Sequence, residues 1–376
     1  MAEPFKNLLS KKEVAAARTH LARVEPDFDG ARFEALALRG LESLELKARA
    51  EHLCAALEAT LPKSFQHSAA AIERALAPAI LSDDLAALRT GPLGLAGWVL
   101  WPMGEFVARR GLGEPERALG CLHAITQRFT AEWAIRPFLE QHTELAFQTL
   151  ARWCADPSLY VRRLVSEGSR PRLPWGRQLK ALIADPAPTL PLLARLQDDP
   201  SEYVRRSVAN HLNDIAKDHP ELVADWVERH VDGANHVRKV LLRRAARTLV
   251  KSGHPRTLAA FGLGRALRGD AELLIAPQRV RIGASVRLAV RVHSRARSAQ
   301  PLEIDYAVHH VKANGETSPK VFKGWRRELA AGADLELEKT HSLRRITTRT
   351  YHPGEHRIEL RINGKTVAQA TFCLGR

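Results

Sequence analysis

The sequence predicts a mostly α protein with a small all-β domain at its C-terminal end. In residues 1 to about 270, apolar residues recur at helical spacing, and short Pro, Gly and Asp turns separate the helices. After Arg268 the sequence pattern changes to runs in which apolar, often β-branched residues alternate with polar ones, such as RVRIGASVRLAVRV. The tripeptides ANG and ING mark turns between these runs. We therefore expect a helical domain over residues 1–268 and a β-sandwich over residues 269–376.

A repeat of 43 residues subdivides the helical part. DPSLYVRRLVSEGS, which starts at Asp156, aligns without gaps with DPSEYVRRSVANHL, which starts at Asp199, and a looser copy starts at Gly233. A period in the low forties built from helix pairs is typical of HEAT-type repeats, which stack into a curved solenoid with a concave surface. In the first copy, Asp156 or Ser158 is expected to cap the following helix.

The composition favours a polyanionic partner and argues against export. A net charge of +15 suits a protein that neutralises phosphates, although a well-solvated basic surface is the alternative. The four cysteines are far apart and indicate neither disulfides nor a zinc site. The N-terminus lacks a signal peptide, and no segment reaches 18 apolar residues. We expect a cytoplasmic protein, most simply a monomer, without a membrane segment, metal or cofactor.

The repeat helices combine an apolar face with a column of polar residues. The apolar positions expected in the core are Val161, Leu164, Val165, Val204 and Val208. The polar columns, with residues four apart, are Arg163 and Glu167 in the first copy, Arg206, Asn210 and Asp214 in the second, and Lys239, Arg243, Arg247 and Lys251 in the third. Stacked repeats would form a basic groove that also contains carboxylates. These acids either take part in chemistry or pair with the neighbouring arginines.

Two further segments bear on this groove. In EWAIRPFL, Glu132 and Arg136 stand four apart, so Glu132 is either a helix-face acid or a third carboxylate of the groove. Trp133, Trp153 and Trp226 have helical spacing and are expected in the core. The first repeat copy breaks at Gly168, where the stretch SEGSRPRLPWG replaces a continuing helix. This break is expected to project Arg170, Arg172 and Trp175 toward the groove, with two prolines stiffening the loop.

On these motifs the helical part resembles the AlkC/AlkD superfamily of bacterial alkylbase DNA glycosylases, and the AlkC type in particular. The resemblance rests on PFKNLLS, EWAIRPFL, the DPSxYVRR repeat, SEGSRPRLPWG, VRRSVANHLNDIAK and VRKVLLRRAARTLVKSGHP, and covers most of residues 1–265. The β-rich part looks like the immunoglobulin-like domain that one subgroup of AlkC proteins carries. The resemblance implies base excision repair of alkylated double-stranded DNA: removal of the cationic bases 3-methylcytosine and 3-methyladenine without extruding the lesion, which departs from the base flipping of most glycosylases.

The resemblance also implies roles for individual residues. Glu132, Glu167 and Asp214 match the family's catalytic positions, and Trp175 matches its lesion-contacting position. An N3-methylated base is already a cationic leaving group, so a carboxylate near the deoxyribose is the group that the reaction needs. Asp214 is the first candidate, and the division of labour with Glu132 and Glu167 stays open, as does the preference between the two bases.

Basic residues are expected to hold the duplex by its phosphates. This set comprises Arg163, Arg170, Arg172, Arg206, Lys239, Arg243 and Arg247. Residues 272–376 carry 19 Lys and Arg against 10 Asp and Glu, so the β domain either contacts DNA or is a charged, solvated sandwich. His211, His230 and His236 lack a shared helical face and are not expected to bind metal. The alternative to an enzyme is a non-catalytic HEAT-repeat module that binds nucleic acid or an acidic protein.

Overall fold

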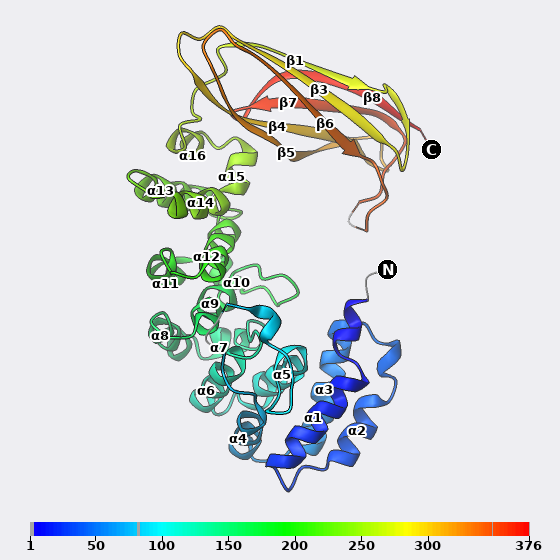
Figure 1. Ribbon diagram of the computed structural model, residues 1–376, viewed down its shortest axis with the longest axis vertical. Coiled ribbons are helices and arrows are strands. Elements are labelled where there is room, and N and C mark those ends of the chain that lie inside the picture. The colour runs from blue at the N-terminus through cyan, green and yellow to red at the C-terminus, as the bar shows by residue number, and fades with distance from the viewer. Residues whose placement is uncertain (1–3, 81–82, 348, 376) are drawn as a thin grey trace. The chain divides into compact units, whose positions relative to one another are not determined.

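The chain folds into two compact units, Met1–Asp218 and His219–Arg376. A computed structural model describes residues 4–80, 83–347 and 349–375. Helices give way to strands between Ala260 and Gly269, as the change of sequence pattern predicts, so the helical part and the all-β part are confirmed (Figure 1). The division into domains at residue 268 stays a prediction, because the second compact unit also includes four helices.

Apart from isolated β-bridges, the regular secondary structure in the described residues of the first unit is helical. Its α-helices are α1 (Lys11–Val24), α2 (Gly30–Leu38), α3 (Leu46–Thr60), α4 (Phe65–Ala75), α5 (Leu100–Arg110), α6 (Pro115–Thr126), α7 (Arg136–Gln141), α8 (Thr143–Trp153), α9 (Leu159–Gly168), α10 (Lys180–Ala184), α11 (Leu190–Leu196) and α12 (Glu202–Ile215). Short 3-10 turns are η1 (Phe5–Leu8), η2 (Leu41–Ser43), η3 (Leu85–Ala87), η4 (Gly97–Val99) and η5 (Ala187–Thr189).

The two gapless repeat copies give α9 and α12, which pack against each other. All five apolar positions predicted for their core are completely buried, so this prediction is confirmed. The N-terminal ends of these helices differ from the side-chain cap that the sequence predicts. The N-cap residues Ser158 and Ser201 make no side-chain cap hydrogen bond. Instead, Asp156 and Asp199 each accept a hydrogen bond from the backbone N–H of that serine at 2.8 Å, which closes the turn before the helix.

A charged contact joins the two copies. The Arg162 guanidinium donates two hydrogen bonds to the Asp199 carboxylate, at 2.6 and 3.1 Å. The same guanidinium also donates to the carbonyls of Asp156 and Pro157. The arginine of one repeat therefore holds its own DPS turn and that of the next repeat, which fixes α9 relative to α12.

The second unit joins four helices to a β-sandwich. The helices are α13 (Pro220–Val231), α14 (His236–Ala245), α15 (Arg247–Ser252) and α16 (Pro255–Ala260), and the strands are β1 (Gly269–Ala276), β2 (Arg279–Arg281), β3 (Ser285–Ser294), β4 (Gln300–Val311), β5 (Thr317–Leu329), β6 (Asp334–Ser342), β7 (Gly354–Ile362) and β8 (Lys365–Gly375). At the end of α15, Gly253 approaches the β7–β8 turn so closely that a Cβ would lie 3.0 Å from the Gly364 carbonyl oxygen. Only glycine allows this contact.

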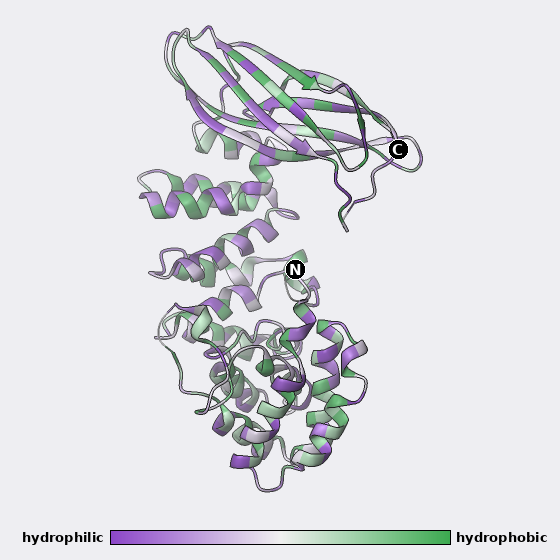
Figure 2. Ribbon diagram, turned by 45° about the vertical axis from the view of Figure 1, so that its right-hand side comes forward, coloured by the Kyte–Doolittle hydropathy of each residue, from purple (hydrophilic) through white to green (hydrophobic). Residues whose placement is uncertain are grey.

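The strands form two sheets that share one core. One sheet has the order β1-β3-β6 and the other β2-β8-β7-β4-β5, with only β2 and β8 parallel among the described pairs. Along β3, buried residues alternate with exposed or half-buried ones, and Figure 2 shows stripes of hydropathy along the strands. Val286 and Leu288 of β3 share a buried cluster with Ile304 of β4 and Phe372 of β8. Both sheets contribute to one apolar layer, as in a sandwich.

Replacing the buried Leu164 of α9 with alanine tests this packing. We expect Leu164→Ala to lower the free energy of unfolding by about 3 kcal/mol, because the lost side chain leaves a cavity between helices. Urea titration followed by circular dichroism measures the loss. The matched control is Val240→Ala, because the Val240 side chain is 54% exposed. An equal loss in both variants would contradict the assignment of Leu164 to the core.

Candidate functional site

Two predicted carboxylates meet between α9 and α12. Glu167 lies at the end of α9 and Asp214 near the end of α12, and they are only 6% and 1% exposed. The Arg170 guanidinium bridges them: its Nη1 donates to Glu167 Oε1 at 2.5 Å and its Nε to Asp214 Oδ2 at 2.8 Å. Ser207 donates to the second Glu167 oxygen at 2.6 Å, and Lys217 to Asp214 Oδ1 at 2.8 Å. Each of the four oxygens thus has a donor.

The third predicted carboxylate joins the same network. Glu132, 7% exposed, accepts hydrogen bonds from the hydroxyl of Thr130 and from the guanidinium of Arg163. Arg163 Nη2 lies 3.6 Å from Glu167 Oε1. The result is a chain of alternating charge that runs Glu132, Arg163, Glu167, Arg170, Asp214 and Lys217. We call this chain the carboxylate network.

Pairing keeps the Glu167 carboxylate ionised although it is buried. Burial alone would raise the pKa of the Glu167 carboxyl, but the Arg163 and Arg170 guanidiniums and the Ser207 hydroxyl outweigh it and hold that pKa below its ordinary value. Burial would likewise lower the pKa of Arg163, and Glu132 and Glu167 reverse the shift. Asp214 and Glu167 also retain acceptor capacity, since a carboxylate offers about four lone-pair sites.

The first repeat copy changes direction at its thirteenth residue, Gly168. Gly168 is the last residue of α9, and a Cβ there would lie 2.6 Å from the Ile135 side chain, so the position favours glycine. The chain then turns, and the segment 169–179 forms what we call the PW loop. Within this loop, Trp175 has a left-handed backbone with φ of 62° and an indole that is 61% exposed. The expected break and the expected exposure of Trp175 are both present.

The PW loop is held by a buried arginine. Arg136 of α7, completely buried, donates from Nη1 to the carbonyls of Gly168 and Arg170 at 2.7 and 2.8 Å. Its Nε and Nη2 donate to the carbonyl of Arg177, at 2.8 and 2.5 Å. Burial lowers the pKa of this guanidinium to about 10, so it is charged at neutral pH. One side chain therefore fixes both ends of the loop.

The structure does not place Glu132 and Arg136 on one helix face, which was one of the two alternatives for Glu132. The chain from Glu132 to Ile135 is a turn rather than an α-helix, and α7 begins only at Arg136. The four-residue spacing therefore does not put the two side chains on one face. Glu132 pairs with Arg163 and Arg136 binds the PW loop. The sequence signal for this difference is Pro137, which is tolerated at the start of a helix but not inside one.

Aromatic residues surround the exposed indole. Trp101 of α5 stacks on Trp133, with ring centroids 4.4 Å apart, and its ring is parallel to that of Trp175 within 4°, at 6.5 Å. Trp133 Nε1 donates to the carbonyl of Pro174 at 3.2 Å. Sequence reasoning assigned Trp133 to the core, and it is half-buried; Trp101 was not singled out. Trp153 is half-buried and Trp226 is buried.

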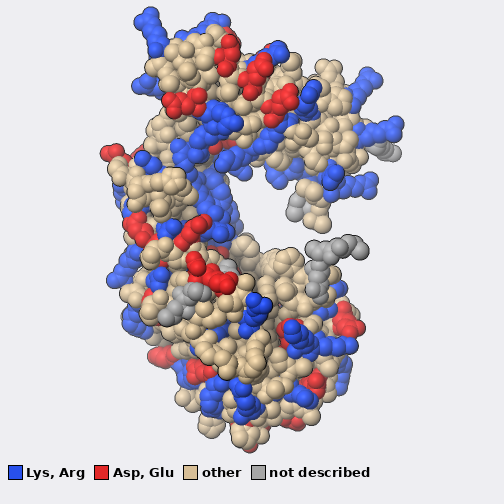
Figure 3. Space-filling model, viewed as in Figure 1, with Lys and Arg blue, Asp and Glu red and all other residues tan. Residues whose placement is uncertain are grey.

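The basic residues expected at DNA fall into two groups. Arg163 is half-buried and Arg170 is buried, both within the carboxylate network, and Arg172 pairs with Asp218 at 2.8 Å near the surface. Arg206, Lys239 and Arg247 are exposed, and Arg243 is half-buried over the Phe261 ring. Figure 3 shows Lys and Arg gathered over α14, α15 and β5 of the second unit. Within that unit, Arg243, Arg247 and Lys251 line a cleft of about 420 Å³ with Lys323 and Arg326.

The three histidines considered in the sequence have different local partners. His211 is buried with Nδ1 against the Ser166 carbonyl at 2.9 Å, and burial lowers its pKa to about 4. His230 contacts the Trp226 carbonyl, and His236 is exposed. In the described ranges no three His, Cys, Asp or Glu side chains converge as metal ligands. No helix in those ranges is long and apolar enough to cross a bilayer.

Comparison with known proteins places this architecture in a family. The model of the DNA alkylation repair enzyme family matches residues 129–249, which include all three carboxylates and Trp175, and that of the C-terminal Ig-like domain of the uncharacterised protein YhaZ matches residues 270–376. Uncharacterised protein YhaZ of Bacillus subtilis (strain 168) is 35% identical over 370 residues, covering 98% of each chain. Pseudomonas fluorescens alkylpurine DNA glycosylase AlkC, solved bound to DNA containing an abasic site analog, is 31% identical, with a TM-score of 0.89 and 100% coverage of both chains. The chain therefore belongs to the DNA alkylation repair enzyme family, in the AlkC-like group with a C-terminal Ig-like domain.

Replacing Arg136 tests how the PW loop is held. We expect Arg136→Met, which keeps an unbranched apolar stem, to lower the free energy of unfolding by about 3 kcal/mol, because it leaves buried carbonyls without donors. Hydrogen exchange should show faster exchange of the amides of residues 168–177. Arg18→Met, which removes an exposed pair with Glu34, is the control. Unchanged exchange in the loop would contradict this role for Arg136.

Proposed function

We propose that this protein is a monofunctional DNA glycosylase of base excision repair. It hydrolyses the N-glycosidic bond of cationic N3-methylated bases, 3-methylcytosine and 3-methyladenine, in double-stranded DNA, and acts as a monomer without flipping the base. We also propose that its helices are HEAT-like repeats. Membership of the DNA alkylation repair family supports this proposal, as does the likeness to an AlkC glycosylase over the whole chain. The observation that carries it is that three buried carboxylates join in one network, which includes Arg170 of the loop that bears the exposed tryptophan.

The three carboxylates and Trp175 suit the hydrolysis of the bond between a cationic base and deoxyribose. A base with a positive charge leaves without protonation, so the barrier lies in the positive charge that develops on the deoxyribose. An ionised carboxylate stabilises that charge and orients the attacking water. Asp214 is the proposed catalytic carboxylate, with Glu132 and Glu167 holding the water or the base. Trp175 offers the face of its indole to the cationic base, which attracts it more strongly than a neutral base.

The arginines divide into two proposed roles. Arg163 and Arg170 already bind carboxylates, and a phosphate contact would require these buried ion pairs to break. We therefore propose that they orient the carboxylates. Arg172, Arg206, Lys239, Arg243 and Arg247 remain the proposed phosphate-binding set, and none of them reads the base sequence.

An oligonucleotide assay tests the reaction. Duplexes that contain one 3-methylcytosine or one 3-methyladenine are incubated with the protein and then treated with alkali, which breaks the strand at an abasic site. We expect excision by the wild-type chain and a loss of at least about 100-fold in Asp214→Asn, because the amide cannot stabilise the developing charge. Binding to the undamaged duplex should be retained.

The matched control is Asp218→Asn, which removes a carboxylate paired with Arg172 outside the network. Binding by the wild-type chain without excision of either base would favour a non-catalytic binding module. Excision by Asp214→Asn at the wild-type rate would assign the catalytic role to another carboxylate.

The salt dependence of binding tests the phosphate contacts. Lys239→Ala removes an exposed ammonium of α14. We expect the slope of log K against log salt concentration to fall by about 1, because one fewer counterion is released. Fluorescence anisotropy of a labelled duplex at several salt concentrations measures the slope. Lys12→Ala, which removes an exposed lysine of α1, should leave it unchanged. If both variants gave the same slope of log K against log salt concentration, Lys239 would not be a phosphate contact.

A further inference from the structure

Trp175 combines an unfavourable backbone conformation with a solvent-exposed indole. Its backbone occupies the left-handed region, with φ of 62°, which residues other than glycine rarely adopt. Its side chain is also 61% exposed, the largest exposed fraction among the described tryptophans. A large apolar ring with such a backbone keeps one orientation only if its surroundings determine it.

Trp101 supplies the face against which this ring is aligned. The planes of the two indoles differ by 4°, with centroids 6.5 Å apart. Trp101 is itself 5% exposed, and its Nε1 donates to Glu105 Oε1 at 3.2 Å within α5. Its ring also stacks on Trp133 at 4.4 Å and touches Trp98 at 6.0 Å. Trp101 is therefore fixed by its own helix and by two other rings.

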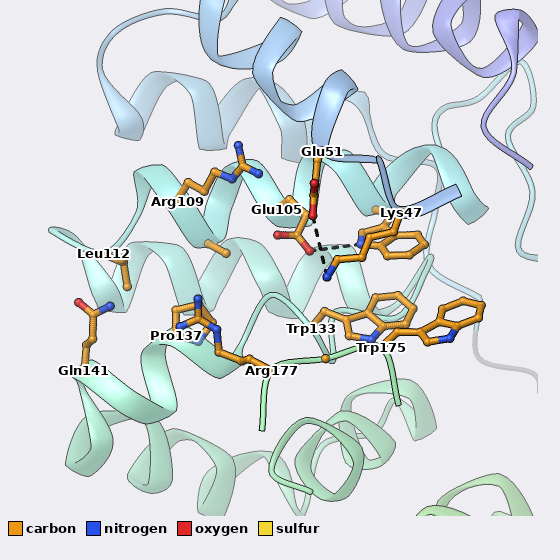
Figure 4. A pocket seen from close by; sticks show the side chains of 13 residues that line it. Lys47, Glu51, Glu105, Arg109, Leu112, Trp133, Pro137, Gln141, Trp175 and Arg177 are labelled. Carbon is orange, nitrogen blue, oxygen red and sulfur yellow. Dashed lines mark hydrogen bonds and ion pairs between the residues drawn. The ribbon is translucent and has the colours of Figure 1, made fainter. Parts of the chain in front are cut away.

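Trp133 connects this stack to the backbone of the PW loop. Its Nε1 donates to the carbonyl of Pro174, the residue before Trp175. Figure 4 shows the Trp133 and Trp175 rings together at one end of a cleft of about 470 Å³, which Glu51 and Glu105 also line. Trp101, Trp133 and Trp175 form what we call the tryptophan platform. The platform joins α5, the turn before α7 and the PW loop, which are far apart in the sequence.

We infer that Trp101 is a positioning residue that sets the orientation of Trp175 toward the damaged base. This inference rests on the proposed function, because Trp175 is there the lesion-contacting residue. Trp101 acts through Trp175 rather than on the substrate. Loss of its aromatic face would free the Trp175 ring to rotate while the buried carboxylate network, which Trp101 does not contact through any described hydrogen bond, keeps its charges.

Two measurements on the full-length chain test this inference. The first is single-turnover excision at saturating enzyme, together with the Kd for the undamaged duplex. In Trp101→Ala we expect the excision rate to fall about 10- to 100-fold, because a small misplacement of a contacting group is costly, and the Kd to stay unchanged. Trp101→Phe keeps a ring face and should restore most of the rate, whereas Trp101→Leu fills the space without one and should not.

The second measurement does not depend on activity. In protein labelled with 5-fluorotryptophan, the fluorine resonance of Trp175 is assigned from its disappearance in Trp175→Phe. We expect this resonance to shift and narrow in Trp101→Ala and Trp101→Leu, because the ring becomes mobile, and to stay near its wild-type position in Trp101→Phe. Trp153→Ala is the control, since Trp153 packs against His123 outside the platform.

The outcomes separate the two proposals. An unmoved Trp175 resonance in Trp101→Leu, or wild-type excision by that variant, would overturn the positioning role. If Trp101→Ala fails to fold, the excision rate and the fluorine resonance of Trp101→Leu decide the question instead. A wild-type chain that excises neither base would refute the proposed function, while the fluorine resonances would still decide whether Trp101 orients Trp175.

Discussion

The carboxylate network depends on one constraint: charges that leave water must find opposite charges. Glu132, Glu167 and Asp214 come from three separate segments, and Arg163 and Arg170 are the cations that join them. Removing Arg163, for example, would leave the buried Glu132 carboxylate without its described ion-pair partner, which is far more costly than losing a surface pair. The helices α9 and α12 and the turn before α7 must therefore keep their spacing for the network to exist.

This constraint also explains why the first repeat copy departs from the second. Position 170 corresponds to Asn213 in the second copy, which is still inside α12. In the first copy α9 ends at Gly168, and the turn that follows directs the Arg170 side chain back between Glu167 and Asp214. The same turn carries the chain outward to Trp175. One break in a helix thus completes the buried network and presents an aromatic ring to solvent.

The sequence predicted the parts of the site that follow from periodicity, and not those that follow from a change of direction. The core positions Val161 and Val208 and the split into helical and β parts were predictable, because an amphipathic pattern fixes which face is buried. The three carboxylates could be named from their motifs. The inward direction of Arg170 could not, because a loop with two prolines has no period from which to read where a side chain points.

Arg136 and Trp101 were missed for a related reason. Arg136 was expected on a helix face beside Glu132, but four-residue spacing has that meaning only inside a helix, and the chain there is a turn. Trp101 lies in an ordinary amphipathic helix, where an aromatic residue most often packs in a core. Its ring lies parallel to that of Trp175, which is 74 residues further along the chain, and no local sequence pattern encodes such a contact.

The way in which Arg136 holds the PW loop has a consequence for how this site can evolve. Within the described part of the chain, its guanidinium donates to main-chain carbonyls alone, those of Gly168, Arg170 and Arg177. Every residue type supplies such a carbonyl, so the attachment does not depend on the side chains between them. The loop is thereby a fixed frame whose exposed residues, Trp175 included, can be exchanged by mutation without loosening the frame. The exposed face of the loop could in this way change within a lineage while the shape of the loop and the buried acids stay constant.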